Sequence, residues 1–220
     1  SKNYLDPTQG IEDLKSKILQ SPQSTNVHTD PLRAFRICRF ASNLSFTPAS
    51  DLIEEIHNLR PEQLELIAGE RITLELNKIL LKSPAPAVGF EWMYKLKIME
   101  RVFPNWNVAP CFKALNNGCI VNLELPKKLT LMWMIALSHT SYSHQERILN
   151  QLFLHTVERY PLRTFVLKGT PLWSNLNMIC SDEDLFIMAE ELELELLCHV
   201  ASSFSHSNAK VNLNRATELG

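Results

Sequence analysis

The sequence predicts an all-α fold made of two successive helical units. Only six glycines occur among its 220 residues, and no stretch shows the sustained apolar–polar alternation of a half-buried strand. Helix start and stop signals instead follow one another along the chain. Hydrophobic residues make up 45% of the sequence, so a packed core is expected beneath these helices.

Four helices are expected in the first unit, at residues 31–44, 49–59, 69–81 and 87–99. The first has Asp30 at its N-cap and Pro31 at its first helical position, which is a favourable start. Pro61 ends the second helix, because proline cannot continue the backbone hydrogen-bond ladder. Pro104 follows the fourth helix and marks the end of the unit.

The second unit shows weaker signals. Helices are expected there at residues 111–117, 127–138, 144–157, 161–167 and 183–202. Breaks are expected at Asn116-Asn117-Gly118 and at residues 168–171, which read Lys-Gly-Thr-Pro. The expected division of the chain is an entry segment at residues 1–28, a helical domain at 29–104 and a second helical domain at 105–220.

Composition narrows the class of protein. No apolar run approaches the roughly 18 residues that a membrane-spanning helix needs. The formal net charge is only −2, so a nucleic-acid partner would have to be recognised by a local basic patch. The five cysteines form no C-x-x-C pair, which favours reduced thiols over a disulfide framework or a zinc site. A cytoplasmic location is therefore expected, and the interior of an organelle stays open.

The most informative residues are three arginines spaced by three. Arg33, Arg36 and Arg39 stay within an arc of about 120° on a helix. Apolar residues cover most of the remaining surface of that helix, so the arginine stripe must face carboxylates, a polar cleft or an anionic ligand. Guanidinium groups suit phosphate or nucleobase recognition. The alternative is that they pair with acids of neighbouring helices, among which are Glu54, Glu55, Glu70 and Glu75.

Three ordered segments of the first unit resemble motifs of a known family. They read D-P-T-Q-G-I-E-D-L at residues 6–14, T-D-P-L-R-A-F-R-I-C-R-F at residues 29–40 and E-R-I-T-L-E-L at residues 70–76. They resemble the hinge motif D-P-x-x-G-x-x-D-L, the motif E-D-P-x-R-x-x-R-x-x-R-F and the motif E-R-I-x-x-E-L of the class II tRNA nucleotidyltransferases. This family comprises the CCA-adding enzymes and bacterial poly(A) polymerases. Beyond Pro104 the resemblance is limited to helical character.

The resemblance implies a role for each matching residue. It makes Asp30 and Arg33 the pair that reads the base edge of incoming CTP or ATP. Arg36 and Arg39 are expected to contact the phosphate side of the nucleotide or to hold the site together. A second set of residues is implied in support, with Glu70 and Arg71 bracing the helical neck and Gly10 and Asp13 forming the hinge.

The resemblance also implies partners and a metal. The partners are tRNA, ATP and CTP, and the first unit corresponds to the neck and the second to the body and tail. Phosphoryl transfer in this family uses Mg held by paired carboxylates of a strand-rich head domain, whose motif has no match here. We therefore expect no catalytic residue in this chain, and no nucleotide addition by the chain alone. The acidic run Asp182-Glu183-Asp184 is expected to start a helix instead.

Other functions stay open at this level. One is a part of a poly(A) polymerase, which shares the same motifs. A second is a stand-alone helical RNA-binding or scaffold protein, favoured by Thr29, which stands where the family has Glu. A third is an interaction domain whose arginine stripe is purely structural.

Overall fold

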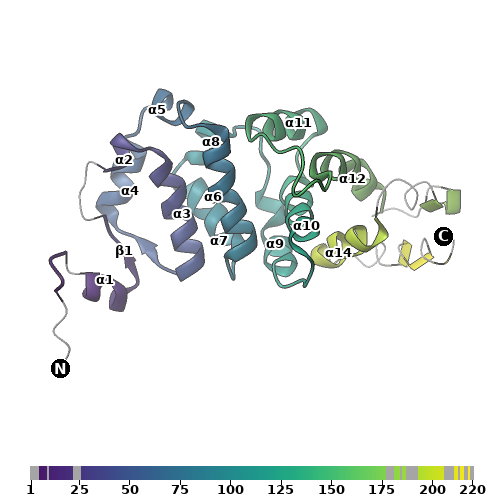
Figure 1. Cartoon of the computed structure of the whole chain (residues 1–220), viewed down its shortest axis with the longest axis horizontal. Helices are drawn as coiled ribbons and strands as arrows, with labels where there is room; N and C mark the ends of the chain where they lie inside the picture. Colours follow the sequence, from purple (N-terminus) through teal and green to yellow (C-terminus); the bar gives the residue numbers. More distant parts are fainter. Residues whose placement is uncertain are drawn as a thin grey trace.

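The computed structural model describes residues 5–8, 10–21, 26–176, 181–183, 185–186, 193–205, 211–212, 214–215 and 218. Within these ranges the all-α prediction is confirmed, because the strand content is limited to two paired residues in each of two short strands. Figure 1 shows the helices arranged in an elongated row, with the first described helices at one end and the last toward the other. No helix among the described residues is long and apolar enough to cross a membrane.

The first group of helices ends before Pro104. Its elements are α1 (Gly10–Ser16), β1 (Ile18–Leu19), α2 (Asn26–Thr29), α3 (Leu32–Leu44), β2 (Thr47–Pro48), α4 (Ser50–His57), α5 (Pro61–Glu65), α6 (Gly69–Lys82), α7 (Pro86–Lys95) and α8 (Ile98–Val102). Strand β1 pairs in parallel with β2, so that Ile18 lies opposite Thr47. Helix α3 packs on α6 and α7, and this trio forms the centre of the group.

The second group follows Pro104. It contains the 3₁₀ turn η1 (Ala109–Cys111), α9 (Phe112–Gly118), α10 (Leu125–Leu137), α11 (Tyr142–Gln151), α12 (Leu162–Leu176) and α14 (Leu194–Phe204). Helix α10 is buried along most of its length and packs against α9, α12, α14 and α6. A helix that is apolar nearly all round belongs in the centre of a helical unit.

One hydrophobic core passes from the first group into the second. The rings of Trp106 and Trp133 stack with their centroids 5.6 Å apart, and both side chains are buried. The Trp133 indole N–H donates to Asn77 of α6 at 2.9 Å, which satisfies a polar atom that burial would otherwise leave without a partner. Buried residues on both sides of Pro104 thus belong to one continuous core. The expected domain boundary there stays a prediction.

Several expected helices and breaks differ from those observed, and the helix expected at residues 144–157 ends at Gln151. The helix expected at residues 87–99 is divided into α7 and α8 at Lys97, whose φ of 56° lies in the left-handed region. The break expected at residues 168–171 is wrong, because α12 continues through them. Gly169 is buried there and α12 packs against α10, α11 and α14, so tertiary packing overrides the local preference of glycine and proline. Most of the helix expected at residues 183–192 lies outside the described residues.

The contact between the two groups requires a glycine at the start of α6. A Cβ at Gly69 would lie 2.0 Å from the backbone oxygen of Gln151 and 3.1 Å from a ring carbon of Phe153. The neighbouring turn is tied down as well, because the hydroxyl of Thr73 donates to the carbonyl of Leu152 at 2.6 Å. The backbones of α6 and of the end of α11 therefore approach too closely for any larger residue.

We predict that Gly69→Ala lowers the free energy of unfolding by about 1–3 kcal/mol, the usual cost of overpacking a close contact. Urea denaturation of the full chain measures this change. Gly10→Ala is the matched control, because its Cβ would meet no heavy atom closer than 3.6 Å. Equal stability of the two variants would contradict the close contact.

Candidate functional site

Helix α3 carries the arginines that the sequence singles out. It begins at Leu32, and Pro31 occupies the position before it without a side-chain cap. The expectation that the Asp30 carboxylate caps this helix is wrong, because its Oδ1 atom accepts from Arg71 of α6 at 3.3 Å. The backbone carbonyl of Asp30 accepts from the N–H of Arg33 at 3.0 Å, which starts the first turn.

Arg33 and Arg36 line one cavity between α3 and the segment around β1. Its volume is about 160 Å³, and it is bounded by apolar side chains as well as by the two arginines. The complete lining consists of Leu19, Gln20, Ser21, Val27, Arg33, Arg36, Ile37, Phe40 and Leu52. The structure therefore brings together two of the four predicted nucleotide-binding residues in a partly apolar hollow.

The Nε atom of Arg33 is buried, and no described residue accepts a hydrogen bond from it. A buried N–H group without an acceptor costs about 1–3 kcal/mol. Proteins keep such groups where a ligand or a water molecule completes the hydrogen bond. Arg33 is therefore the arginine of the stripe that is best prepared to receive an acceptor atom.

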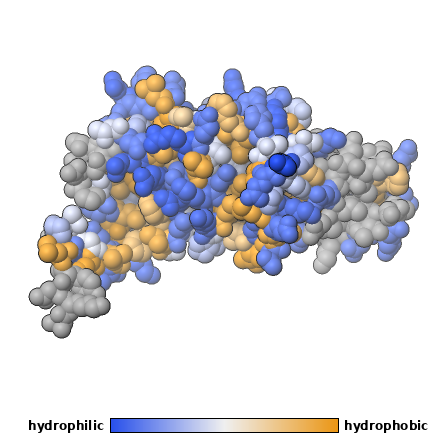
Figure 2. Space-filling view, viewed as in Figure 1, coloured by the Kyte–Doolittle hydropathy of each residue, from blue (hydrophilic) through white to orange (hydrophobic). Residues whose placement is uncertain are grey.

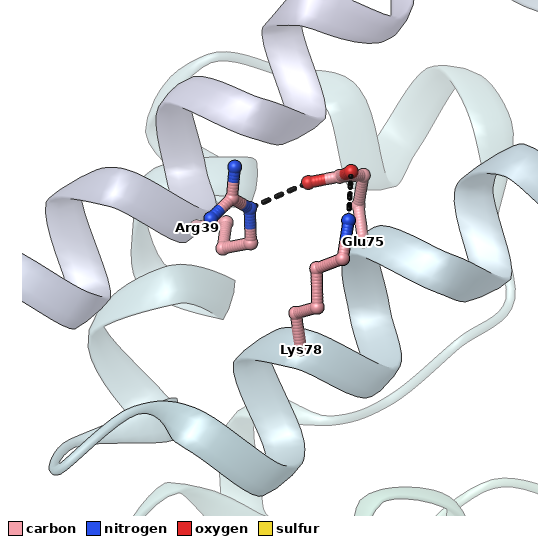
Figure 3. Close-up of polar contacts among 3 residues, drawn as sticks. All are labelled: Arg39, Glu75 and Lys78. Carbon is pink, nitrogen blue, oxygen red and sulfur yellow. Dashed lines mark hydrogen bonds and ion pairs between the residues drawn. The ribbon is translucent and has the colours of Figure 1, made fainter.

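Arg39 points toward α6 and does not line the cavity. Figure 3 shows its guanidinium pointing toward Glu75 of α6, with the Nε atom 2.6 Å from Glu75 Oε2. Lys78 donates to the other carboxylate oxygen at 2.9 Å. The Arg39 guanidinium also lies 3.9 Å from the centroid of the Phe40 ring. The alternative of pairing with a neighbouring acid therefore holds for this arginine.

The charge of Glu75 is stabilised although its side chain is 7% exposed. Burial alone would raise the pKa of this carboxyl group, but hydrogen bonds from Lys78 and Arg39, together with their positive charges, hold the pKa below its ordinary value. Glu75 therefore remains ionised at neutral pH. Together, Arg39, Glu75 and Lys78 form a charged cluster that joins α3 to α6.

The supporting residues differ in their environments. Arg71 lies in the first turn of α6 and reaches back to Asp30, and the two side chains are 54% and 32% exposed. Glu70, beside it, is exposed. An ion pair this exposed contributes about 0–1 kcal/mol to stability, so the contact orients the Asp30 carboxylate more than it stabilises the fold.

The predicted hinge residues Gly10 and Asp13 line a second cavity of about 400 Å³. It lies beside the first and shares Leu19, Gln20 and Ser21 with it. The Asp6 carboxylate accepts from the N–H of Gly10 at 2.8 Å and caps α1. Apolar residues gather on the surface around α1 and β1 (Figure 2).

The described residues contain no group of three or more potential metal ligands. Of the acidic run at 182–184, Asp182 forms an ion pair with Arg215, and Asp184 lies outside the described residues. The guanidinium groups of α3 suit the described site to bind a ligand that carries hydrogen-bond acceptors.

Sequence reasoning did not identify every residue of this site. Lys78 was missed, although its i,i+3 spacing from Glu75 is the ordinary signal for a helical ion pair. Gln20 and Ser21 line both cavities without any motif that would indicate this. Both residues directly follow β1. Because β1 pairs with β2, the strand that comes shortly after α3, the pairing brings Gln20 and Ser21 next to α3.

We predict that Glu75→Gln lowers the free energy of unfolding at pH 7 by about 2 kcal/mol, less than the usual 3–5 kcal/mol for breaking a buried ion pair, because Lys78 stays hydrated. The folded-state pKa of Glu75 is depressed, so its contribution is present above the unfolded pKa near 4.5 and is lost as the pH falls through the folded value. Urea denaturation from pH 7 to pH 3 should show wild type and variant converging in acid.

Glu70→Gln is the matched control for that measurement, because it removes the same charge from an exposed position on the same helix. It should change stability by no more than about 0.5 kcal/mol. A difference between wild type and Glu75→Gln that stays constant down to pH 3 would contradict the ionised cluster.

Sequence comparisons place the chain among known proteins. Residues 45–109 match the family described as "Probable RNA and SrmB- binding site of polymerase A". The chain is 33% identical over 107 residues to the A-adding tRNA nucleotidyltransferase of Deinococcus radiodurans, covering 47% of this chain and 24% of that protein. It is 32% identical over 161 residues to the CCA-adding enzyme of Actinobacillus succinogenes, covering 64% and 40%.

Solved structures share the fold at lower sequence identity. A CCA-adding enzyme in complex with CTP superposes with a TM-score of 0.70 at 17% identity, covering 96% of this chain and 52% of that chain. The Thermotoga maritima CCA-adding enzyme complexed with tRNA gives a TM-score of 0.63 at 15% identity, covering 96% and 53%. This chain thus spans about half or less of the length of these relatives. Taken together, the matches support the assignment of this chain to a part of a protein of the class II tRNA nucleotidyltransferase family, which comprises CCA-adding enzymes and bacterial poly(A) polymerases.

Proposed function

We propose that the chain is the nucleotide- and RNA-binding part of a tRNA nucleotidyltransferase that adds CMP and AMP to the 3′ end of tRNA without a nucleic-acid template. The observation that carries the proposal is the cavity of α3, in which Arg33 and Arg36 lie together and Arg33 keeps a buried Nε–H without an acceptor. Family membership supports this assignment, because relatives have solved structures with CTP and with ATP.

The cavity supplies donors, and the start of α3 supplies an acceptor. Guanidinium groups donate to ring nitrogens, carbonyl oxygens or phosphate oxygens, whereas a carboxylate only accepts. Cytosine and adenine each present an exocyclic amino group next to a ring acceptor. An Asp30 carboxylate and an Arg33 guanidinium are therefore a chemically complementary pair for these two bases.

Arg36 and Arg39 have different roles in this proposal, one in binding phosphate and the other in holding α3. Arg36 is exposed and lines the cavity, so it is free to approach the negatively charged phosphates of a nucleotide. Arg39 is held by Glu75 and keeps α3 in place against α6. A cavity of about 160 Å³ encloses only part of a nucleotide, and the adjoining second cavity beside α1 extends the available space.

The second group of helices is proposed to grip the RNA. The match to a family described as an RNA-binding site covers residues 45–109, almost all of them in the first group, so the RNA surface is proposed to begin there and to continue onto the second group. A relative with the same fold was solved with tRNA. Basic side chains such as Lys113, Arg147 and Arg159 are exposed on η1–α12, where they are available to RNA phosphates. Lysine and arginine are sparse here, so recognition by shape is expected to contribute.

Metal-dependent chemistry is proposed to belong to another part of the protein. Mg would be held there by carboxylates of a head domain, as the resemblance to the family implies. In this proposal the chain selects the nucleotide and holds the RNA, and it performs no bond-forming step itself.

We predict that the Kd for CTP and for ATP rises at least about tenfold in Arg33→Ala, because charge-assisted hydrogen bonds contribute about 1.5–3 kcal/mol. Isothermal titration calorimetry at low salt measures both constants. Binding of tRNA should survive the substitution, because the proposed RNA grip lies on other helices.

Arg147→Ala is the control, since it removes the same charge from an exposed position on α11. It should leave nucleotide binding unchanged. If Arg147→Ala weakens CTP binding as much as Arg33→Ala does, the nucleotide is attracted by overall charge and the proposed site is wrong.

A further inference from the structure

Arg71 contacts only one of the two carboxylate oxygens of Asp30, the residue proposed to read the base. Arg71 binds one oxygen of the carboxylate, Oδ1, through one nitrogen, Nη2, at 3.3 Å. No described residue is recorded as donating to the other oxygen, Oδ2. A carboxylate held at one oxygen cannot rotate freely about its Cβ–Cγ bond, and its second oxygen keeps a defined direction.

Neighbouring contacts keep Arg71 at this position. Its backbone N–H donates to the carbonyl of Ala68 at 3.0 Å in the first turn of α6. The start of that helix is pinned by Gly69 against the Gln151 carbonyl. On the other side, Gln63 of α5 donates to the carbonyl of His28 at 3.1 Å, two residues before Asp30. Both partners of the ion pair therefore rest on anchored backbone.

We propose that Arg71 is a specificity-determining positioning residue, which holds Oδ1 of Asp30 so that Oδ2 accepts from the exocyclic amino group of cytosine or adenine. This inference rests on the proposed function. Arg71 acts through Asp30 and does not itself touch the base. Uracil and guanine present a carbonyl oxygen in place of that amino group, and a fixed carboxylate oxygen repels it.

The role of Arg71 in base selection is separate from its small contribution to the stability of the fold. The ion pair is exposed, so its loss should barely change folding. A carboxylate released by Arg71→Ala samples several orientations, and it accepts from the amino group in only a fraction of them. Selectivity should therefore fall while the fold and the general attraction for triphosphates persist.

The test is the ratio of the Kd for UTP to the Kd for CTP, measured by calorimetry on the full chain. In Arg71→Ala we expect this ratio to fall about threefold to tenfold, through a higher Kd for CTP and ATP and a Kd for UTP that changes less than about twofold. Lys82→Ala, at the exposed end of α6, removes the same charge and should leave the ratio unchanged.

A double variant separates positioning from direct contact. If Arg71 acts only through Asp30, then Arg71→Ala adds no further loss of selectivity to Asp30→Asn. The proposal would be overturned if Arg71→Ala left the ratio of the two Kd values unchanged, for instance by weakening the binding of CTP and UTP equally. Tighter binding of CTP by the variant would overturn it as well. A wild-type chain that does not distinguish CTP from UTP would instead overturn the proposed base reading by Asp30 and Arg33.

Discussion

The buried carboxylate of Glu75 is the interaction that fixes how α3 lies in this structure. A charge removed from water must be paired, since its desolvation costs several kcal/mol, and Arg39 and Lys78 provide the pairing. Because α3 must turn Arg39 toward α6, the rotation of the whole helix about its axis is set. Arg36 and Arg33 lie about 60° and 120° further round, and they line the cavity beside β1. One arginine of the stripe therefore anchors the helix, and the other two are left available to a ligand.

Helix α6 also contacts the second group of helices. Thr73 donates to the carbonyl of Leu152, and Asn77 accepts from the indole of Trp133. Glu75, between these two residues in sequence, points to α3 instead. Helix α6 therefore holds both α3, which carries the arginines of the cavity, and the second group of helices, and its start at Gly69 allows no side chain. A displacement of α6 would affect both surfaces together.

Much of this fold was predictable from periodicity and from helix signals, and the reasons for the failures are physical. The helices expected at residues 31–44 and 69–81 match α3 and α6 to within one residue at each end. The left-handed turn at Lys97 and the passage of α12 through Gly169 depend instead on packing that no local pattern records. In the site, the arginine spacing indicated a functional face. It did not reveal that Arg39 belongs to Glu75, because a choice among four nearby acids is decided only by tertiary structure.

The most direct test of this account is an NMR titration of the arginine Nε–H groups of the full chain with CTP, assigned through Arg33→Lys, Arg36→Lys and Arg39→Lys. The Arg33 and Arg36 signals should shift and saturate together, since these groups line the cavity. The Arg39 signal should stay in place, because its Nε–H already donates to Glu75. A shift of Arg39 without Arg33, or shifts confined to arginines outside α3, would contradict the division of the stripe.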